Sequence, residues 1–349
     1  METGFSYYFG TDTEKNKAIL AKAADAGMRY VFTSMHIPEE KVENYREKVL
    51  EFIRACRSRN FKCMVDVSPH TLEKLRCADY GELAALGVEH LRLDFGFSNK
   101  EIVELSRSFN IVFNASTQSQ SDLDDWRNLG ADFSRFFACH NFYPKPLTGL
   151  SMESVAKTNA RLTSQGFTTM AFVAGDKPGE AGRRGPLFAG LPTVEEHRAA
   201  DPFLSMLALR FDAGCDIVLL GDIDASDETW RRIKEYNEGY VSLRSILDSD
   251  FENLKNIVHH DRPDSSEHVL RSVESRLAGR KVAPKGRADP RKAGDVFISN
   301  SNFLRYEGEL EIARKELDPD ERVNVVGHVH QEDLPYVRYI KDGLGFMLQ

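Results

Sequence analysis

Four aspartates stand in or directly after short apolar runs of the sequence, and their carboxyl groups could do acid–base chemistry. They are Asp66, Asp94, Asp176 and Asp222. The runs are nearly continuous in apolar residues, which is typical of parallel strands buried on both faces. Because the carboxyl ends of such strands meet on one side of a barrel, we expect the four aspartates to converge. One aspartate alone would as readily be a helix cap or a bonded core residue, but four together favour a site.

Polar side chains also end two further apolar runs. The run 111–113 is followed by Asn114, and the run that ends at Cys139 continues with His140, Asn141 and Tyr143. Working groups of barrel enzymes come from strand ends and from the loops that follow them. We therefore include these polar residues among the site candidates.

A basic, glycine-rich segment spans residues 175–186. It combines four glycines with Lys177, Arg183 and Arg184. Glycine lets backbone N–H groups approach an oxyanion, and the arginine fork matches a phosphate or a carboxylate. The alternative is a flexible solvated loop. In a chain of net charge −8, however, a basic loop beside Asp176 favours a small anionic substrate.

Two glutamates follow this segment. Thr193 and Glu196 have the spacing of a capping box, which predicts a helix that begins there and makes Glu196 structural. Glu195, at the start of the same helix, either only favours the helix dipole or lies in the site.

Eight strand-like runs must position these residues. They begin near residues 5, 30, 62, 91, 111, 133, 168 and 216. Five of the helix-like stretches between them end in a glycine just before the next strand, the usual left-handed stop. These glycines are Gly27, Gly87, Gly130, Gly166 and Gly214. Eight such repeats predict an α/β chain folded as a (β/α)8 barrel, with a doubly wound open sheet as the alternative.

The pattern of predicted elements changes near Tyr236. From about residue 240 onward, short β-rich segments surround a loop at 279–294 that is rich in glycine, proline and basic residues. We therefore predict a barrel catalytic domain over residues 1–238 and a smaller, mostly β domain over 239–349.

The composition excludes several classes of protein. The chain has 349 residues, of which 41% are hydrophobic, and it contains no apolar stretch of membrane-spanning length. Its first residues lack the pattern of a signal peptide, and its five cysteines form no C-x-x-C pair. These features predict a cytoplasmic protein with reduced thiols. The net charge of −8 argues against a nucleic acid or an anionic membrane as partner.

Motifs for metals and cofactors are weak or missing. The pairs His328/His330 and His259/His260 have no evident third ligand, and no dinucleotide or P-loop fingerprint is present. We predict neither a metal nor a cofactor.

Several longer strings are similar to those of one bacterial family. They are His140–Pro144 with Thr148–Ser151, Phe113–Thr117, Leu91–Phe97, and Gly185–Leu187 with Gly190–Arg198. On these strings the chain resembles, over essentially its whole length, the MupG family, formerly called DUF871 and named for a 6-phospho-N-acetylmuramidase. The resemblance implies a (β/α)8 barrel followed by a small cyclophilin-like β domain. It also implies a cytoplasmic glycosidase that cleaves the β-1,4 bond of a phosphorylated amino-sugar disaccharide, MurNAc-6-phosphate–GlcNAc, in cell-wall recycling. Apart from the resemblance, we expect the second domain either to close over the barrel mouth or to form a homodimer.

Glycoside hydrolysis usually needs two carboxyl groups. We expect Asp94 to be one of them and Asp66 or Glu195 to be its partner, with Asp222 in reserve. A separation of about 5 Å between the two groups would indicate retention and about 6.5–9.5 Å inversion. Attack by the acetamide of the substrate is a third possibility.

The remaining candidates would bind the substrate. Asn114, His140, Asn141 and Tyr143 are suited to sugar hydroxyls and the acetamide. The loop residues Asp176, Lys177, Arg183 and Arg184 include the three cations suited to the 6-phosphate or the lactyl carboxylate. Two other functions stay open, because a fold does not fix its chemistry. One is a phosphosugar lyase, aldolase or isomerase, and the other is a non-catalytic sugar-phosphate-binding protein.

Overall fold

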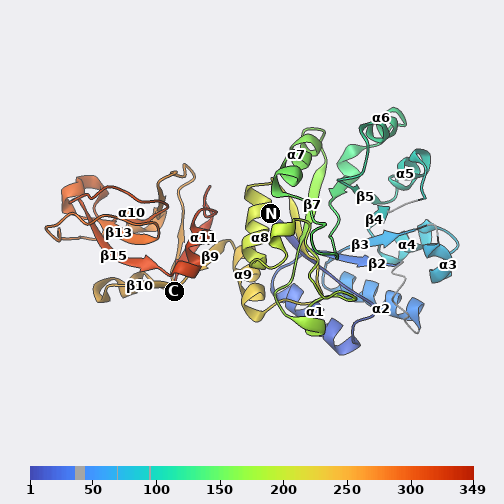
Figure 1. Cartoon of the computed structure of the whole chain (residues 1–349), viewed down its shortest axis with the longest axis horizontal. Coiled ribbons are helices and arrows are strands. Elements are labelled where there is room, and N and C mark those ends of the chain that lie inside the picture. Colours follow the sequence, from blue (N-terminus) through green and yellow to red (C-terminus); the bar gives the residue numbers. More distant parts are fainter. Residues whose placement is uncertain (36–43, 69, 94–95) are drawn as a thin grey trace. The chain divides into compact units, whose positions relative to one another are not determined.

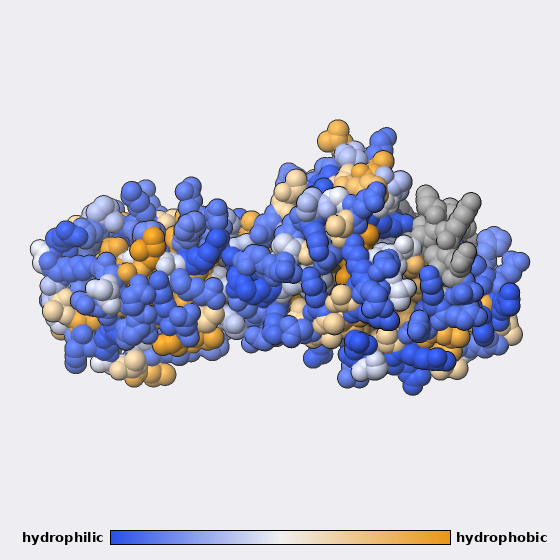
Figure 2. Space-filling view, turned by 90° about the horizontal axis from the view of Figure 1, so that it is seen from below, coloured by the Kyte–Doolittle hydropathy of each residue, from blue (hydrophilic) through white to orange (hydrophobic). Residues whose placement is uncertain are grey.

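The computed structural model describes residues 1–35, 44–68, 70–93 and 96–349, and Figure 1 traces the chain. The chain divides into two compact units, Met1–Lys234 and Glu235–Gln349. The face of the molecule in Figure 2 is largely hydrophilic over both units, with apolar residues scattered among the polar ones. In the described part of the chain, no helix has the length and apolar character needed to cross a bilayer.

The first unit is a closed barrel of eight parallel strands in sequence order. The strands are β1 (Glu2–Ser6), β2 (Tyr30–Ser34), β3 (Lys62–Val67), β4 (His90–Leu93), β5 (Asn110–Asn114), β6 (Phe136–Cys139), β7 (Thr168–Val173) and β8 (Ile217–Leu220). Strand β1 pairs with both β2 and β8, which closes the sheet. The predicted (β/α)8 barrel is confirmed, and the open-sheet alternative is excluded.

Helices form the outer layer of this unit (Figure 1). They are α1 (Thr13–Asp25), α2 (Tyr45–Ser58), α3 (Thr71–Leu75), α4 (Tyr80–Leu86), α5 (Asn99–Leu105), α6 (Gln120–Asn128), α7 (Met152–Thr163), α8 (Pro202–Phe211) and α9 (Asp227–Asn237). Local chemistry explains many of their ends. Ser98 and Ser119 each form a capping box at the start of a helix. All five predicted stop glycines have positive φ, from 65° at Gly214 to 106° at Gly87, where a side chain would be strained.

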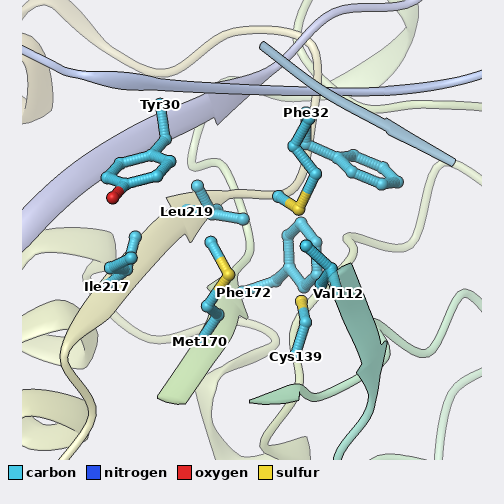
Figure 3. Packing of buried hydrophobic residues seen from close by; sticks show 9 residues of the cluster. Tyr30, Phe32, Val112, Cys139, Met170, Phe172, Ile217 and Leu219 are labelled. Carbon is cyan, nitrogen blue, oxygen red and sulfur yellow. The ribbon is translucent and has the colours of Figure 1, made fainter. Parts of the chain in front are cut away.

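Apolar side chains fill the interior of the barrel (Figure 3). The cluster comprises Tyr30, Phe32, Met64, Val112, Cys139, Met170, Phe172, Ile217 and Leu219. On β2, β7 and β8 two members stand two residues apart, because alternate side chains of a strand point to the same face. The same alternation puts Asp66, two residues after Met64, and Asn114, two residues after Val112, on the inner face toward the carboxyl ends of the strands.

The second unit is mostly β, as predicted. A five-stranded sheet has the order β10-β15-β13-β14-β12, and a three-stranded sheet has the order β11-β16-β9. The strands are β9 (Tyr240–Leu243), β10 (Ser245–Leu247), β11 (Val258–His260), β12 (Val269–Arg271), β13 (Asp295–Ser299), β14 (Leu310–Ala313), β15 (Val323–Val329) and β16 (Gly345–Leu348). The short helices α10 (Val273–Ala278) and α11 (Leu334–Val337) complete the unit.

Candidate active site at the barrel mouth

A buried ion pair joins two neighbouring strands at the mouth of the barrel. Asp66 on β3 stands opposite Arg92 on β4 in the strand register, and alternation turns both side chains inward. Nη1 of Arg92 lies 2.9 Å from Oδ1 of Asp66, and each side chain is 8% exposed. A guanidinium at this distance favours the ionised form of the carboxyl group. The site therefore places a carboxylate oxygen directly against a guanidinium, with both side chains buried.

Asn141 extends this pair into a cluster of three polar groups. Nη2 of Arg92 donates a hydrogen bond to the amide oxygen of Asn141, which follows β6. Asp66, Arg92 and Asn141 line a cavity of about 180 Å³ together with aromatic rings of Phe32, Phe142 and Phe172. We call it the small cavity. An aromatic wall that faces a few convergent polar groups is typical of a small-molecule site.

The aromatic wall of the small cavity is itself well packed. The ring of Phe172 lies 5.3 Å from Phe32 and 5.1 Å from Phe142 between centroids, and both contacts are edge-to-face. Phe32 and Phe172 belong to the barrel core (Figure 3). The floor of the small cavity is therefore continuous with the core, which fixes the positions of the polar groups.

Arg92 is a functional candidate that the sequence places at a strand end, on one face with Asp94, but to which it assigns no role. It lies within the run Leu91–Leu93 and is 7% exposed. Its position between two buried leucines could have identified it, because a buried charge needs a partner of opposite charge. Asp94 lies outside the described residues.

Glu195 connects two loops of the barrel mouth. Its Oε1 accepts the N–H of Leu147 at 2.8 Å, and its Oε2 accepts the N–H of Gly149 at 2.7 Å. Arg198 binds both carboxylate oxygens at 2.7 Å. The bidentate bond from Arg198, with help from the two backbone donors, lowers the pKa of Glu195 to about 2. Both carboxylate oxygens are thus engaged, and the group stays ionised at neutral pH. Glu195 therefore acts as a clamp, by which we mean that it holds the loop at residues 147–149 to its own loop, and it is unsuited to donate a proton.

Asp222, directly after β8, also faces backbone donors. Its Oδ2 accepts the N–H groups of Gly175 and Leu191 at 2.9 and 3.0 Å, and its Oδ1 accepts that of Arg184 at 3.1 Å. The side chain is fully buried. Burial raises the pKa of Asp222, and the three backbone donors act in the opposite direction. These contacts make Asp222 the anchor of the long loop after β7.

His140 is buried in a chain of hydrogen bonds below the mouth. Its Nδ1 lies 2.9 Å from the hydroxyl of Ser116, and its Nε2 lies 2.9 Å from Oδ1 of Asn159. The amide nitrogen of Asn159 donates to the carbonyl of Ala213, which orients the amide and assigns the ring proton of His140 to Nε2. Burial lowers the pKa of His140, so the ring is neutral near pH 7. Both ring nitrogens are engaged, and the ring is 0% exposed.

Asn114 and Tyr143 lie in less enclosed positions. Oδ1 of Asn114 accepts the N–H of Ser116 at 3.0 Å, an Asx turn that ends β5. The backbone N–H of Tyr143 donates to the carbonyl of Pro192 at 2.9 Å, and its side chain is half-buried. Their positions at the ends of β5 and β6 suit contact with a ligand in the mouth.

Asp176 and Lys177, two loop residues predicted to bind substrate, form hydrogen bonds and an ion pair with other residues of the chain. The carboxylate of Asp176 accepts bonds from the N–H and hydroxyl of Ser226 and from the hydroxyl of Thr229, at the start of α9. Nζ of Lys177 lies 2.7 Å from Asp224, and this bond raises the pKa of Lys177. Both side chains therefore fix the loop after β7 to the α9 side of the barrel.

The two arginines of the same loop differ from each other. Arg183 is partly buried, and its charge lies close enough to act on Asp222. The guanidinium carbon of Arg184 lies 4.8 Å from the ring centroid of Tyr8. Arg184 and Tyr8 line a second cavity, of about 560 Å³, between the loops after β1 and β7. We call it the large cavity.

The predicted capping box at Thr193 is wrong. Thr193 is fully buried, and its hydroxyl accepts the N–H of Phe172 and donates to the carbonyl of Asn141, both at 2.9 Å. Only a 3-10 turn over Glu195–His197 follows, and α8 begins later, where Asp201 caps it. The hydroxyl is not available for a cap, because it forms tertiary hydrogen bonds to Phe172 and Asn141. The second of these bonds holds the backbone of Asn141 beside the small cavity. Among the described residues, no group of three His, Cys, Asp or Glu side chains has the arrangement of a metal site.

The chain is similar in structure to two solved bacterial proteins. One is a conserved Enterococcus faecalis protein described as having an unknown function, with 30% identity and a TM-score of 0.80. That similarity covers 100% of this chain and 96% of the other. The second is an uncharacterised B. cereus protein, with 26% identity, a TM-score of 0.75, and coverage of 100% and 99%. A search of curated proteins gives no significant match.

Family models account for nearly the whole chain. The model of the N-terminal part of 6-phospho-N-acetylmuramidase matches residues 3–235, and the model of its C-terminal part matches residues 241–349. The resemblance noted from the sequence strings is thereby confirmed. The chain belongs to the 6-phospho-N-acetylmuramidase (MupG) family.

Proposed function

We propose that the protein is a glycosidase that hydrolyses the β-1,4 bond between MurNAc 6-phosphate and GlcNAc. Membership of the family supports the reaction class. The observation that carries the proposal is the cluster of Asp66, Arg92 and Asn141 in the small cavity, at the end of the barrel where enzymes of this fold hold their catalytic groups.

In this proposal Asp66 acts as a carboxylate. Its ion pair with Arg92 disfavours the protonated form, so Asp66 is unsuited to donate a proton to the leaving oxygen. A fixed carboxylate can activate a water molecule, attack the anomeric carbon, or orient the acetamide of the substrate. Each role adds water across the bond and yields one MurNAc 6-phosphate and one GlcNAc.

The general acid must be a second carboxyl group. Glu195 does not suit this role, because its pKa of about 2 keeps it ionised. Asp222 does not suit it either, because it is fully buried against backbone donors. The sequence candidate for the acid is therefore Asp94, which lies two residues after Arg92 in the chain.

Arg92 and Asn141 are proposed as positioning residues. Arg92 contacts Asp66 and Asn141 at once, so it fixes the angle between the carboxylate and the amide. Asn141, Asn114 and Tyr143 stand at strand ends around the mouth and offer amide and hydroxyl groups to a sugar. His140 would act indirectly, by fixing the positions of Ser116 and of the end of β5.

The wider setting of the reaction is also a proposal. We place the catalytic domain in residues 1–238 and a cyclophilin-like domain in residues 239–349, and we propose a homodimer as the assembly. A cytoplasmic location fits the phosphorylated substrate and the five cysteines, which form no disulfide in the structure.

The experiment uses the purified full chain with MurNAc-6-phosphate–GlcNAc and measures release of GlcNAc. Wild type is expected to release it, whereas Asp66→Asn and Asp94→Asn are expected to be slower by about 10²–10⁴-fold. The matched control is Asp124→Asn, which removes an exposed carboxylate on α6 that pairs with Arg127. Turnover near that of wild type in both site variants would exclude this assignment.

A further inference from the structure

The large cavity and the small cavity border the same cluster of apolar side chains. Tyr8 and Leu191 pack together with Phe142 and Ile223. Phe142 lines the small cavity, whereas Tyr8 and Ile223 line the large one. Two spaces of about 180 and 560 Å³ therefore border this one apolar cluster, each through different residues of it. This arrangement suits a ligand of two linked units.

The charged groups of the large cavity are mixed in sign. Arg184 and Lys15 supply two cations, and Asp12 and Glu180 supply two carboxylates. A polyanion would be repelled by the carboxylates. A hydroxylated ring with a single anionic group matches the set, since carboxylates accept bonds from hydroxyls and arginine binds phosphate. Tyr8 and Phe188 add aromatic surface to the lining.

Arg184 is the cation best placed for an anion. Within the described part of the chain its guanidinium has no carboxylate partner; it contacts the face of Tyr8 at 4.8 Å. Its backbone N–H is bound by the buried Asp222, so the start of its side chain is fixed. Lys177 of the same loop is already neutralised by Asp224 at 2.7 Å. Lys15 makes a long bond, 3.3 Å, to the carbonyl of Glu180, and no other side-chain bond to the residues that the structure describes.

We propose that the large cavity is the subsite for the phosphorylated sugar, with Arg184 as the main phosphate ligand and Lys15 as the second. This inference rests on the proposed function, because it assigns the two rings of the disaccharide to the two cavities. The phosphorylated ring lies against Tyr8, and the bond to be cleaved lies on the Phe142 side, toward Asp66.

Direct binding tests the subsite apart from catalysis. Calorimetric titration of the full chain with MurNAc 6-phosphate and with MurNAc is compared for wild type, Arg184→Gln and Arg184→Lys. Loss of a charge-assisted bond is expected to weaken MurNAc 6-phosphate binding by about 10–100-fold in Arg184→Gln and less in Arg184→Lys. Binding of MurNAc is expected to stay within about twofold, and inorganic phosphate is expected to compete with MurNAc 6-phosphate only.

The matched control is Lys17→Gln. It removes one cation from the same helix as Lys15, but Lys17 pairs with Glu14 and does not line the cavity. Its affinity for MurNAc 6-phosphate is expected to equal that of wild type. Three results would each overturn the subsite. They are a loss of affinity in Arg184→Gln that is equal for both sugars, a loss of affinity in Lys17→Gln as large as that in Arg184→Gln, and no binding of MurNAc 6-phosphate by wild type. The unfolding midpoints of all variants identify any loss of affinity that comes from misfolding. If Arg184→Gln is misfolded, the comparison of Arg184→Lys with wild type is the test.

Hydrolysis separates this inference from the proposed function. If MurNAc 6-phosphate binds through Arg184 but wild type releases no GlcNAc from the disaccharide, the subsite stands and the glycosidase proposal fails. If GlcNAc is released but Arg184→Gln lowers kcat/KM equally for phosphorylated and unphosphorylated disaccharides, the glycosidase proposal stands and the subsite fails.

Discussion

The guanidinium of Arg92 and the carboxylate of Asp66 lie 2.9 Å apart across two neighbouring strands, and each side chain is 8% exposed. Burial of two charges costs free energy that their attraction only partly returns, and well-packed apolar residues often serve stability as well. The pair faces the small cavity, where a fixed carboxylate is useful for chemistry. We therefore interpret it as a functional pair that the barrel tolerates.

This interpretation predicts that stability and activity respond differently when the pair is removed. Arg92→Met leaves the buried carboxylate of Asp66 without its cation and is expected to lower the free energy of unfolding by about 3–5 kcal/mol. The double variant Asp66→Asn/Arg92→Met is expected to recover most of that loss while remaining inactive. Urea unfolding and the GlcNAc-release assay measure the two quantities. A double variant as unstable as Arg92→Met would contradict the account.

Glu195→Gln tests the clamp between the mouth loops. The amide cannot bind Arg198 as a carboxylate does, so we expect a loss of about 1–3 kcal/mol in the free energy of unfolding. We expect kcat to fall by less than about tenfold, because Glu195 does not transfer a proton. A loss of about 10³-fold in kcat without a change in stability would instead make Glu195 catalytic.

The same clamp has a defined pH dependence. The pKa of Glu195 in the folded protein, about 2, is below its ordinary value of 4.5. The unfolded chain therefore binds the proton first, and stability from this group is complete above pH 4.5 and is lost as the pH falls toward 2. Unfolding curves from pH 5 to pH 2.5 are expected to converge for wild type and Glu195→Gln. A constant difference over that range would contradict the clamp.

Asp222→Asn tests the anchor of the loop after β7. An asparagine oxygen can still accept the bonds of Gly175 and Leu191, but its amide group would face the N–H of Arg184. We expect a loss of about 1–3 kcal/mol in the free energy of unfolding and weaker binding of MurNAc 6-phosphate, since Arg184 is held there. Unchanged stability together with a large loss of kcat would assign Asp222 to the chemistry.

Buried histidines predict a second acid sensitivity, which sets in at a higher pH than that of Glu195. Burial lowers the pKa values of His90 and His197 from 6.5 to about 4. The unfolded chain binds protons first, so stability is full above pH 6.5 and falls between pH 6.5 and about 4, by about 1.4 kcal/mol per pH unit for each histidine. His90→Gln is expected to reduce that slope by about one proton in urea unfolding at pH 4.5–6.5. An unchanged slope would show that His90 is not neutral and buried.

Local chemistry was enough to predict much of the fold from sequence. The apolar runs predicted all eight barrel strands, and glycines such as Gly87 marked helix ends because only their backbone adopts positive φ without strain. Thr193 shows the limit of this reasoning. Its spacing to Glu196 matches a cap, but its hydroxyl is used by Phe172 and Asn141, which are distant in sequence.

The candidate site was less predictable, because it depends on the register between strands and on what each carboxylate faces. Asp66 and Arg92 meet only because β3 and β4 align them. Glu195 and Asp222 have the residue type of a catalytic group, but backbone donors occupy their oxygens. In the basic loop, Lys177 and Arg184 look equivalent in sequence, but Lys177 pairs with Asp224 whereas Arg184 contacts Tyr8 and lines the large cavity.

The most direct test of the central claim is the amount of GlcNAc released from MurNAc-6-phosphate–GlcNAc by wild type and by Asp66→Asn under identical conditions. We expect one GlcNAc and one MurNAc 6-phosphate for each disaccharide consumed by wild type, and a rate about 10²–10⁴-fold lower in a folded Asp66→Asn variant. No release by wild type, or release by Asp66→Asn at the rate of wild type, would contradict it.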